Sequence, residues 1–349
     1  MVDYLVIGLG LAGVSFCENL LENKKSFKVI SDDSQTSSVV AGGLYNPVIL
    51  KRFTAAWQAE EQLKLALLFY KKVEQKLGVQ LDYKIPVLRK FVSVEEQNMW
   101  FEAMDKPKLK PFLSKEILKN NTQHIDAPFG YGEVLGTGRI DTRKLLSKYA
   151  NFLLQTELLL QESFDFSALE MLDDGVLYKG IKAQKIVFAT GFGLKNNPYF
   201  NYLPLHGTKG QLLTIKAPGL KEEKVIKSSV FIIPLGDDLY RVGATYEQKD
   251  KTNTITTEAK NELLKKLESF LQCSYEVIDH VAGIRPSTRD RRPLVGHHPE
   301  HKNMYVLNGF GSRGVMIAPY ASKQLYNFIE NNIELDAEMD ITRFTKKFF

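Results

Sequence analysis

Three glycines near the N-terminus constrain the fold of this chain more than any other feature. Gly8, Gly10 and Gly13 follow an apolar run at residues 4–7 and precede a helical pattern over residues 14–21. A strand that turns through glycines into a helix presents free backbone N–H groups and the positive end of a helix dipole. Gly8 allows the tight turn, Gly10 lets a pyrophosphate approach the backbone, and Gly13 lets the helix pack on the strand.

A second apolar run at residues 28–31 completes a strand–turn–helix–strand unit, as long as a βαβ crossover requires. Asp32 stands directly after this run, where a carboxylate that accepts hydrogen bonds from ribose hydroxyls is expected, with Asp33 as the alternative. Ala12 belongs to the same turn as the glycines. The unit predicts a dinucleotide site, and at this point NAD and FAD fit equally well.

The totals exclude several other classes of protein. The chain has 349 residues, of which 44% are hydrophobic and 25% charged, values that suit two interlocked globular domains. Cys17 and Cys273 are too few for a disulfide framework or a cysteine zinc site, and we expect a cytoplasmic protein. No run approaches the ~18 apolar residues of a membrane span. The net charge of +5 suits an anionic cofactor or nucleic acid without requiring either.

Three later turns favour FAD over NAD. Residues 37–47 supply small side chains where a backbone can lie against a flavin ring, residues 185–191 end a strand in a glycine turn, and residues 309–314 form a glycine-rich loop before a helix. The predicted cofactor-binding residues are Gly8, Gly10, Ala12, Gly13, Asp32, Ser38, Ala41, Gly42, Gly43, Leu44, Thr190, Gly191, Gly309, Gly311, Ser312, Arg313, Gly314 and Val315.

These motifs, in this order and over nearly the whole chain, resemble those of the D-amino-acid oxidase and glycine oxidase superfamily of flavoenzymes. The series also includes residues 209–211, 232–235, 242–246 and 282–286. The resemblance implies an α/β fold, with a Rossmann-like FAD-binding domain interleaved with an α+β substrate domain built on an antiparallel sheet. We expect the FAD-binding domain to comprise residues 1–80, 138–203 and 284–349, and the substrate domain to comprise residues 81–137 and 204–283.

Residues 285–296, 311–314 and 43–47 are more particular. They look like the flavin domain of the MnmC family, which oxidatively removes the carboxymethyl group from 5-carboxymethylaminomethyl-2-thiouridine in tRNA. Because residue 1 already begins the flavin fold, we expect a stand-alone version of that half without the companion methyltransferase domain. Relatives of the sarcosine oxidase type attach FAD through a cysteine near the C-terminal loop. Neither Cys17 nor Cys273 lies there, so the predicted FAD is non-covalent.

Amine oxidation by a flavin needs an unprotonated nitrogen and an oriented C–H bond rather than an obligatory acid–base pair. Arg285 suits the orienting role, because a guanidinium holds a carboxylate with two parallel hydrogen bonds. Tyr246, at the end of a predicted strand, either closes the pocket on this carboxylate or is a rim aromatic of the hairpin. Arg313 stands one position away from the loop arginine of glycine oxidases, so its role is less firmly implied. These three residues are the catalytic candidates.

Residues 289–292 form a basic run, Arg-Asp-Arg-Arg, that fits either a contact with tRNA phosphates or structural ion pairs. His297, His298 and His301 suggest a metal, but no carboxylate or cysteine is spaced to complete the ligand set. We therefore expect surface histidines and no metal. Cys17, on the first helix, is expected to be a small core residue.

The sequence thus predicts an FAD-dependent enzyme that acts on CH–NH groups, with a carboxylate-bearing amine as substrate. The resemblance favours the modified uridine of tRNA as that substrate, and a free amino acid such as glycine, sarcosine or a D-amino acid is the alternative. A flavin-binding assembly protein without turnover is the alternative from another class. No membrane partner is expected.

Overall fold

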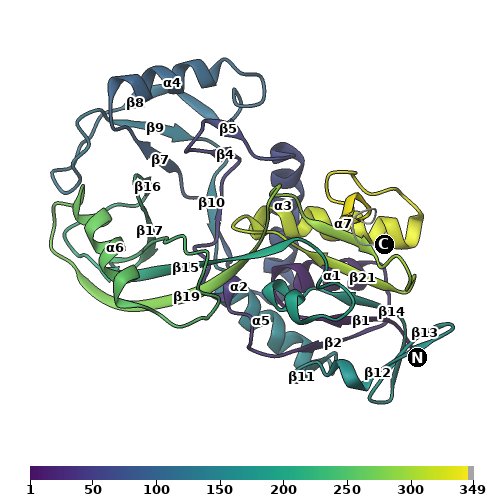
Figure 1. Cartoon of the computed structure of the whole chain (residues 1–349). Coiled ribbons are helices and arrows are strands. Elements are labelled where there is room, and N and C mark those ends of the chain that lie inside the picture. The colour runs from purple at the N-terminus through teal and green to yellow at the C-terminus, as the bar shows by residue number, and fades with distance from the viewer. Residues whose placement is uncertain (345–349) are drawn as a thin grey trace.

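The computed structural model describes residues 1–344 and contains two large sheets (Figure 1). The first sheet is built around β1 (Val2–Ile7), which pairs in parallel with β2 (Phe27–Ser31) and β14 (Ile181–Phe188). Parallel pairing continues to β11 (Leu159–Gln161) at one side and to β21 (Met304–Asn308) at the other. Antiparallel strands complete the sheet: β12 (Leu169–Leu172), β13 (Gly175–Tyr178) and β20 (Leu294–His297).

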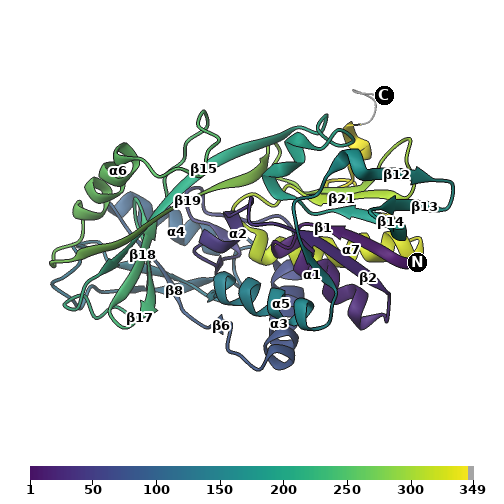
Figure 2. The ribbon, with the colours of Figure 1, turned by 90° about the horizontal axis from the view of Figure 1, so that it is seen from below.

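Four helices lie together beside this sheet, as Figures 1 and 2 show: α1 (Leu11–Glu22), α3 (Ala59–Leu77), α5 (Thr142–Gln155) and α7 (Gly314–Asn331). α1 connects β1 to β2, as the glycine motif predicts. One apolar core joins these helices to the sheet, because the side chains of α1, α3 and α7 and the strand residues Tyr4 and Val6 belong to a single buried cluster. The helices therefore cover one face of the sheet and hold the N-terminus of α1 in place.

α7 contains a proline in its second turn, and the structure accommodates it with a hydrogen bond from another helix. Pro319 has no N–H, so the carbonyl of Val315 loses its usual partner within the helix. The hydroxyl of Tyr70 on α3, a fully buried side chain, donates to this carbonyl at 2.9 Å. Tyr70 thus gives the buried carbonyl of Val315 the hydrogen bond that Pro319 cannot supply, and the helix continues through the proline.

The second sheet is almost entirely antiparallel. It consists, in spatial order, of β19 (Glu276–Thr288), β15 (Leu205–Lys216), β18 (Leu239–Gly243), β17 (Phe231–Gly236), β16 (Val225–Lys227), β7 (Val87–Lys90), β9 (Tyr131–Val134) and β8 (Leu113–Leu118). Only β16 and β7 pair in parallel. α6 (Thr257–Glu268) covers one face through Leu263 and Leu267, and α4 (Val94–Met104) packs near β8.

Short elements join the two large sheets. A three-stranded sheet contains β3 (Leu44–Tyr45), β10 (Gly138–Ile140) and β6 (Asp82–Tyr83), and a hairpin pairs β4 (Val48–Ile49) with β5 (Thr54–Ala55). α2 (Ser37–Val40) and two 3₁₀ turns, Phe166–Ala168 and Gly191–Asn196, complete the described elements.

The predicted fold class is confirmed, and several element bounds are corrected. The apolar spacing of residues 55–77 predicts one helix, but the helix begins at Ala59, because Ala55 belongs to β5. The helical patterns at residues 257–271 and 318–331 also differ from the structure, where α6 ends at Glu268 and α7 begins at Gly314. Asp141 caps α5 by accepting from the backbone N–H of Lys144 at 3.0 Å.

β19 runs through residue 288, so the expected boundary between residues 283 and 284 falls inside a continuous strand. The domain limits given above remain our proposal. Across the described residues, no helix is both long enough and apolar enough to cross a membrane.

Candidate functional site

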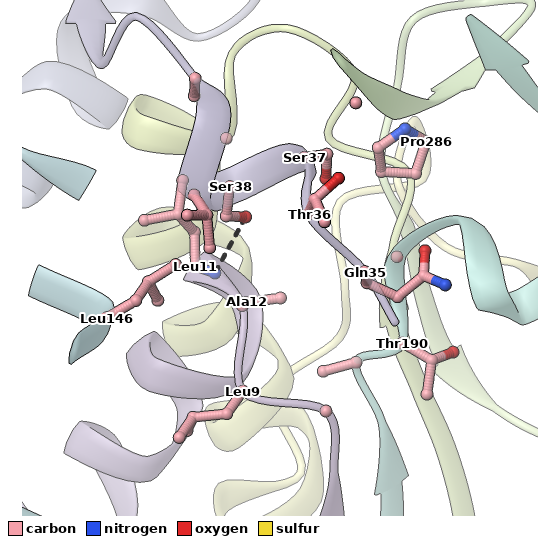
Figure 3. Close-up of a pocket in the computed structure, with 18 of the residues that line it drawn as sticks. Leu9, Leu11, Ala12, Gln35, Thr36, Ser37, Ser38, Leu146, Thr190 and Pro286 are labelled. Atoms are coloured by element: carbon pink, nitrogen blue, oxygen red, sulfur yellow. Dashed lines mark hydrogen bonds between the residues drawn. The ribbon is translucent and has the colours of Figure 1, made fainter. Parts of the chain in front are cut away.

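A cavity of about 1030 Å³ extends from the N-terminus of α1 to the second sheet, and its walls come from both sheets. Figure 3 shows part of its lining, where the turn and helix start that carry Leu9, Leu11 and Ala12 lie across from Gln35 and Thr190, and Ser38 lies beside Leu11. The predicted cofactor-binding residues that line it are Gly8, Gly10, Ala12, Asp32, Ser38, Ala41, Gly42, Gly43, Leu44, Thr190, Gly191, Gly311, Ser312, Gly314 and Val315. Gly13, Gly309 and Arg313 do not line it.

The glycine turn has the geometry that a pyrophosphate site needs. Gly8 has a φ of 96°, and a Cβ atom there would lie 2.6 Å from the carbonyl oxygen of Ala189. A Cβ atom at Gly13 would lie 2.0 Å from the carbonyl oxygen of Gly8, so its absence lets the helix approach the strand. Gly10 is the N-cap of α1, which has neither a side-chain cap nor an acidic residue in its first turn. The helix therefore directs uncapped N–H groups and positive dipole charge into the cavity.

The adenosine end of the cavity contains Asp32 at the end of β2. Its carboxylate accepts hydrogen bonds from the hydroxyls of Ser34 and Ser163, at 2.6 and 2.5 Å. Burial raises the pKa of Asp32, but the hydrogen bonds outweigh this effect and hold it below its usual value. Asp32 is thus an ionised acceptor beside the expected ribose position, and Asp33 also lines the cavity.

The turn after α2 passes between the two sheets. Ser38 accepts a hydrogen bond from the backbone N–H of Leu11 at 3.4 Å, which ties α2 to the glycine turn (Figure 3). Gly43 has a φ of 72°, and a Cβ atom there would lie 1.9 Å from the carbonyl oxygen of Ile140. A side chain at this position is therefore excluded, so the backbone stays close to β10 and the cavity wall.

Thr190 and Gly191 form the opposite wall, where β14 ends. The Oγ1 atom of Thr190 is buried and has no hydrogen-bond partner among the described residues. An unpartnered buried hydroxyl in a large cavity fits a bound ligand that supplies the partner. Asn308, which the sequence analysis did not identify, donates to the carbonyl of Gly191 at 2.9 Å and accepts from the N–H of Gly309 at 2.8 Å. It connects the β14 turn to the C-terminal glycine loop.

Arg285 lies at the end of the cavity formed by the second sheet. Its guanidinium donates to the carbonyl of Thr245 at 3.3 Å and stacks on the ring of Tyr246, 5.1 Å from the ring centroid. A Cβ atom at Gly210 would lie 2.0 Å from Nη2 of Arg285, so the glycine makes room for the guanidinium. Burial lowers the pKa of Arg285, and no carboxylate of the described chain lies within ion-pair distance. A largely buried cation without an anionic partner is suited to an anionic ligand.

Tyr246 and Arg313 stand beside this end of the cavity rather than in its wall. The side chain of Tyr246 is 60% exposed. Arg313 is the N-cap residue of α7, and burial together with the charges of Arg291 and Arg292 lowers its pKa. Tyr246 raises the pKa of both Arg285 and Arg313, so it lies within electrostatic range of both guanidinium groups. The structure thus brings the three catalytic candidates together.

The basic run divides into paired and unpaired residues. Arg292 contacts Glu338 at 2.7 Å, and Asp290 pairs with Arg343 at 3.2 Å, so both have structural partners. Arg289 and Arg291 are exposed and form no ion pair within residues 1–344. The structural interpretation therefore applies to Asp290 and Arg292.

The histidine prediction requires two corrections. Glu300 does lie with His298 and His301, with potential ligand atoms within 4.8 Å of one another, and His298 is buried rather than on the surface. However, Nδ1 of His298 accepts the backbone N–H groups of Glu300 and His301, at 3.1 and 3.2 Å. Since this nitrogen is used to hold the turn, the absence of a metal centre stays our prediction. Cys17 is fully buried in the core, as predicted.

A model of the FAD dependent oxidoreductase family, DAO, matches residues 3–327. The chain belongs to this family. The walls of the cavity fit FAD, since they combine the N-terminus of α1, the carboxylate of Asp32 and the buried hydroxyl of Thr190, which has no partner among the described residues. The protein is an FAD-dependent oxidoreductase of the kind that acts on CH–NH groups, with an α/β fold similar to that of glycine oxidases. Cys17 and Cys273 do not line the cavity, and non-covalent attachment remains a prediction.

Individual relatives differ in what their names describe. The bifunctional protein MnmC of tRNA 5-methylaminomethyl-2-thiouridine biosynthesis from Azoarcus sp. (strain BH72) is 27% identical over 181 residues, which cover 46% of this chain and 28% of that protein. Glycine oxidase from Bacillus licheniformis is 25% identical over 240 residues, covering 67% and 63%. The crystal structure of iminodiacetate oxidase from Chelativorans sp. BNC1 has a TM-score of 0.80 at 17% identity, covering 97% and 98%. The chain thus matches less than a third of the length of the MnmC protein.

Proposed function

We propose that this enzyme oxidises a secondary or primary amine whose reacting carbon carries a carboxylate, and that Arg285 binds that carboxylate. The observation that carries the proposal is the position of Arg285. Its guanidinium is largely buried at one end of the FAD cavity and has no carboxylate partner in the described chain. A buried cation in a protein is usually paired with a neighbouring carboxylate. Because Arg285 has no such partner in the described chain, its position favours a ligand that carries a carboxylate.

Bound FAD supplies the two-electron acceptor for the reaction. The protein holds the carboxylate on Arg285, so that the adjacent C–H bond is directed along the cavity toward the cofactor. The carbon loses a hydride while the lone pair of the unprotonated nitrogen forms a C=N bond, so no further base is needed for the C–H bond. Hydrolysis of the C=N bond by water then separates the amine from an oxo acid. For an N-carboxymethyl amine, these products are the shortened amine and glyoxylate.

We further propose that the amine is the carboxymethylaminomethyl group of a tRNA wobble uridine. Three observations support this choice over a free amino acid. Tyr246, which stacks on Arg285, is 60% exposed, so a larger molecule can approach this side of the guanidinium. Arg289 and Arg291 are exposed without ion pairs within residues 1–344, and Arg291 lies within electrostatic range of Arg313, so both are available to phosphate groups. The similarity to MnmC proteins agrees with such a substrate.

A free amino acid of the glycine type is the second candidate. The match to glycine oxidase from Bacillus licheniformis covers 67% of this chain, more than the match to the MnmC protein does. Arg285 serves both substrates equally, because glycine and a carboxymethylamino group present the same carboxylate.

Anaerobic bleaching of the flavin distinguishes the candidates. Glycine, sarcosine, D-alanine and tRNA bearing 5-carboxymethylaminomethyl-2-thiouridine are added in parallel, with tRNA lacking this modification as the control. We expect bleaching by the modified tRNA and not by the control. Bleaching by the free amino acids alone overturns the tRNA proposal and leaves the carboxylate proposal intact. A flavin that no carboxylate-bearing amine reduces overturns both.

A further inference from the structure

The segment that carries Tyr246 is a long exposed connection, and the described contacts show how it is held. Residues 246–256 join β18 to α6 and are mostly exposed. An exposed connection of this length has few apolar contacts to fix it. Yet Tyr246 stacks on Arg285, so the position of this segment decides what covers the guanidinium.

β15 holds this segment with one face and accommodates Arg285 with the other. Successive residues of a strand point to opposite faces. Gly210 lies against the guanidinium of Arg285, while its neighbours Lys209 and Gln211 contact the segment. Gln211 holds the C-terminal end of the segment through two hydrogen bonds with Thr256. The Thr256 N–H donates to Oε1 of Gln211 at 2.9 Å, and Nε2 of Gln211 donates to Oγ1 of Thr256 at 3.1 Å.

Lys209 provides the central attachment. Its side chain is fully buried, and Nζ lies 2.5 Å from Oδ2 of Asp250 and 3.4 Å from Oγ1 of Thr252. The backbones of Lys209 and Glu247 also exchange two hydrogen bonds, at 2.8 and 3.0 Å. Asp250 is the only carboxylate within ion-pair distance of Lys209 in the described chain. Breaking this pair leaves a buried ammonium without a counter-charge, which strongly favours rearrangement of the segment.

We propose that Lys209 and Asp250 are positioning residues for substrate recognition, which hold residues 246–256 so that Tyr246 stays on Arg285. This inference rests on the proposed role of Arg285 in binding the substrate carboxylate. Neither residue lines the cavity, so both act through the segment that they anchor. Loss of the pair removes the ion pair that ties this segment to β15 and leaves the backbone hydrogen bonds of Lys209 and Glu247, so the ring of Tyr246 fixes the guanidinium of Arg285 less tightly. Carboxylate binding weakens, while the hydride-transfer step on bound substrate changes little.

The test compares Lys209→Met, Asp250→Asn and the double variant with wild type. Lys249→Met is the matched control, since it removes a lysine of the same segment whose ammonium forms no hydrogen bond or ion pair within residues 1–344. Each single variant is expected to raise KM for the carboxylate-bearing amine roughly tenfold or more with kcat within about threefold of wild type, because uniform binding is lost. The double variant is expected to be less impaired than Asp250→Asn, because removing Lys209 as well leaves no buried ammonium without a counter-charge.

Two further measurements do not depend on turnover. The dissociation constant of acetate, read from the change in flavin absorbance, is expected to rise in the single variants and not in Lys249→Met. Trypsin is expected to cleave after Lys249 and Lys251 faster in Asp250→Asn than in wild type, at equal flavin content. Unchanged acetate binding and unchanged cleavage in Asp250→Asn overturn the inference, even if Lys209→Met fails to fold. If wild type oxidises no carboxylate-bearing amine, the proposed function fails, while the cleavage result still tests the anchor.

Discussion

Replacement of Arg285 by alanine separates substrate binding from protein stability. A buried hydrogen-bonded charge pair costs about 2–5 kcal/mol when one partner is removed. Because each ~1.4 kcal/mol is a tenfold change in affinity, kcat/KM for a carboxylate-bearing amine should fall roughly 30-fold to several-thousand-fold. The burial of the guanidinium, which has no carboxylate partner among the described residues, favours the upper end of this range. Arg285→Lys keeps the charge but loses the two-pronged geometry, so its loss should be intermediate.

The free energy of unfolding of Arg285→Ala should rise or stay unchanged, although kcat/KM falls. In the free enzyme the guanidinium is desolvated without an anionic partner, and its removal relieves that cost. Steady-state kinetics and urea unfolding of the same preparations measure the two effects. Lys72→Ala, which removes an exposed lysine paired with Glu22 on the helical side, is the control and should change neither. An unchanged kcat/KM in Arg285→Ala removes Arg285 from the substrate site. A kinetic loss matched by equal destabilisation assigns it a structural role instead.

Three further outcomes are expected. Gly210→Ala should raise KM about tenfold at normal flavin content, because its Cβ atom would lie 2.0 Å from Nη2 of Arg285; unchanged kinetics would show that the guanidinium moves freely. Heat or acid should release intact FAD into the supernatant, and colour retained by the pellet would contradict non-covalent binding, with Cys17→Ser and Cys273→Ser identifying any attachment. Burial raises the pKa of Glu330, but hydrogen bonds from Lys25, Tyr4 and Lys185 outweigh it and hold the value at about 2. This carboxylate therefore stabilises the fold by up to about 3 kcal/mol above pH ~4.3, and the contribution disappears as the pH falls toward 2. Urea unfolding of Glu330→Gln and wild type should show a gap that narrows below pH ~4.3, and a gap constant to pH 3 would refute this.

The parts of the fold set by local sequence were predictable. Glycines at 8, 10 and 13 leave few alternatives to a strand–turn–helix unit, and the structure places their virtual Cβ atoms against backbone at Gly8 and Gly13. The Gly-Asp-Asp sequence at residues 236–238 likewise favours a hairpin turn, and all three residues adopt positive φ in the structure. In such cases the residue type itself carries the backbone requirement.

The parts set by distant contacts were not. Ala55 fits a helical pattern but pairs with Val48 in a hairpin. The sequence of β19 shows no clear alternation of polar and apolar residues, and this strand is defined by its long pairing with β15. The last helix begins at Gly314, four residues before the expected residue 318, and the hydroxyl of Tyr70 on α3 bonds the Val315 carbonyl that Pro319 leaves without a helix partner. Arg285 could be proposed from its motif, but its partnerless burial beside Gly210 depends on how two long strands pack. The buried pair of Lys209 and Asp250 gave no sequence signal at all.

The long pairing of β19 with β15 affects how this protein unfolds and loses FAD. β19 begins at Glu276 at the outer edge of the second sheet and ends near the glycine loop, where Gly311 donates to the carbonyl of Pro286 at 2.8 Å. One strand therefore carries Arg285, the proposed substrate-binding residue, and contacts the glycine loop proposed to bind FAD. Loosening at either end is transmitted along the same ladder of hydrogen bonds, so loss of FAD and melting of the second sheet should occur as one cooperative transition.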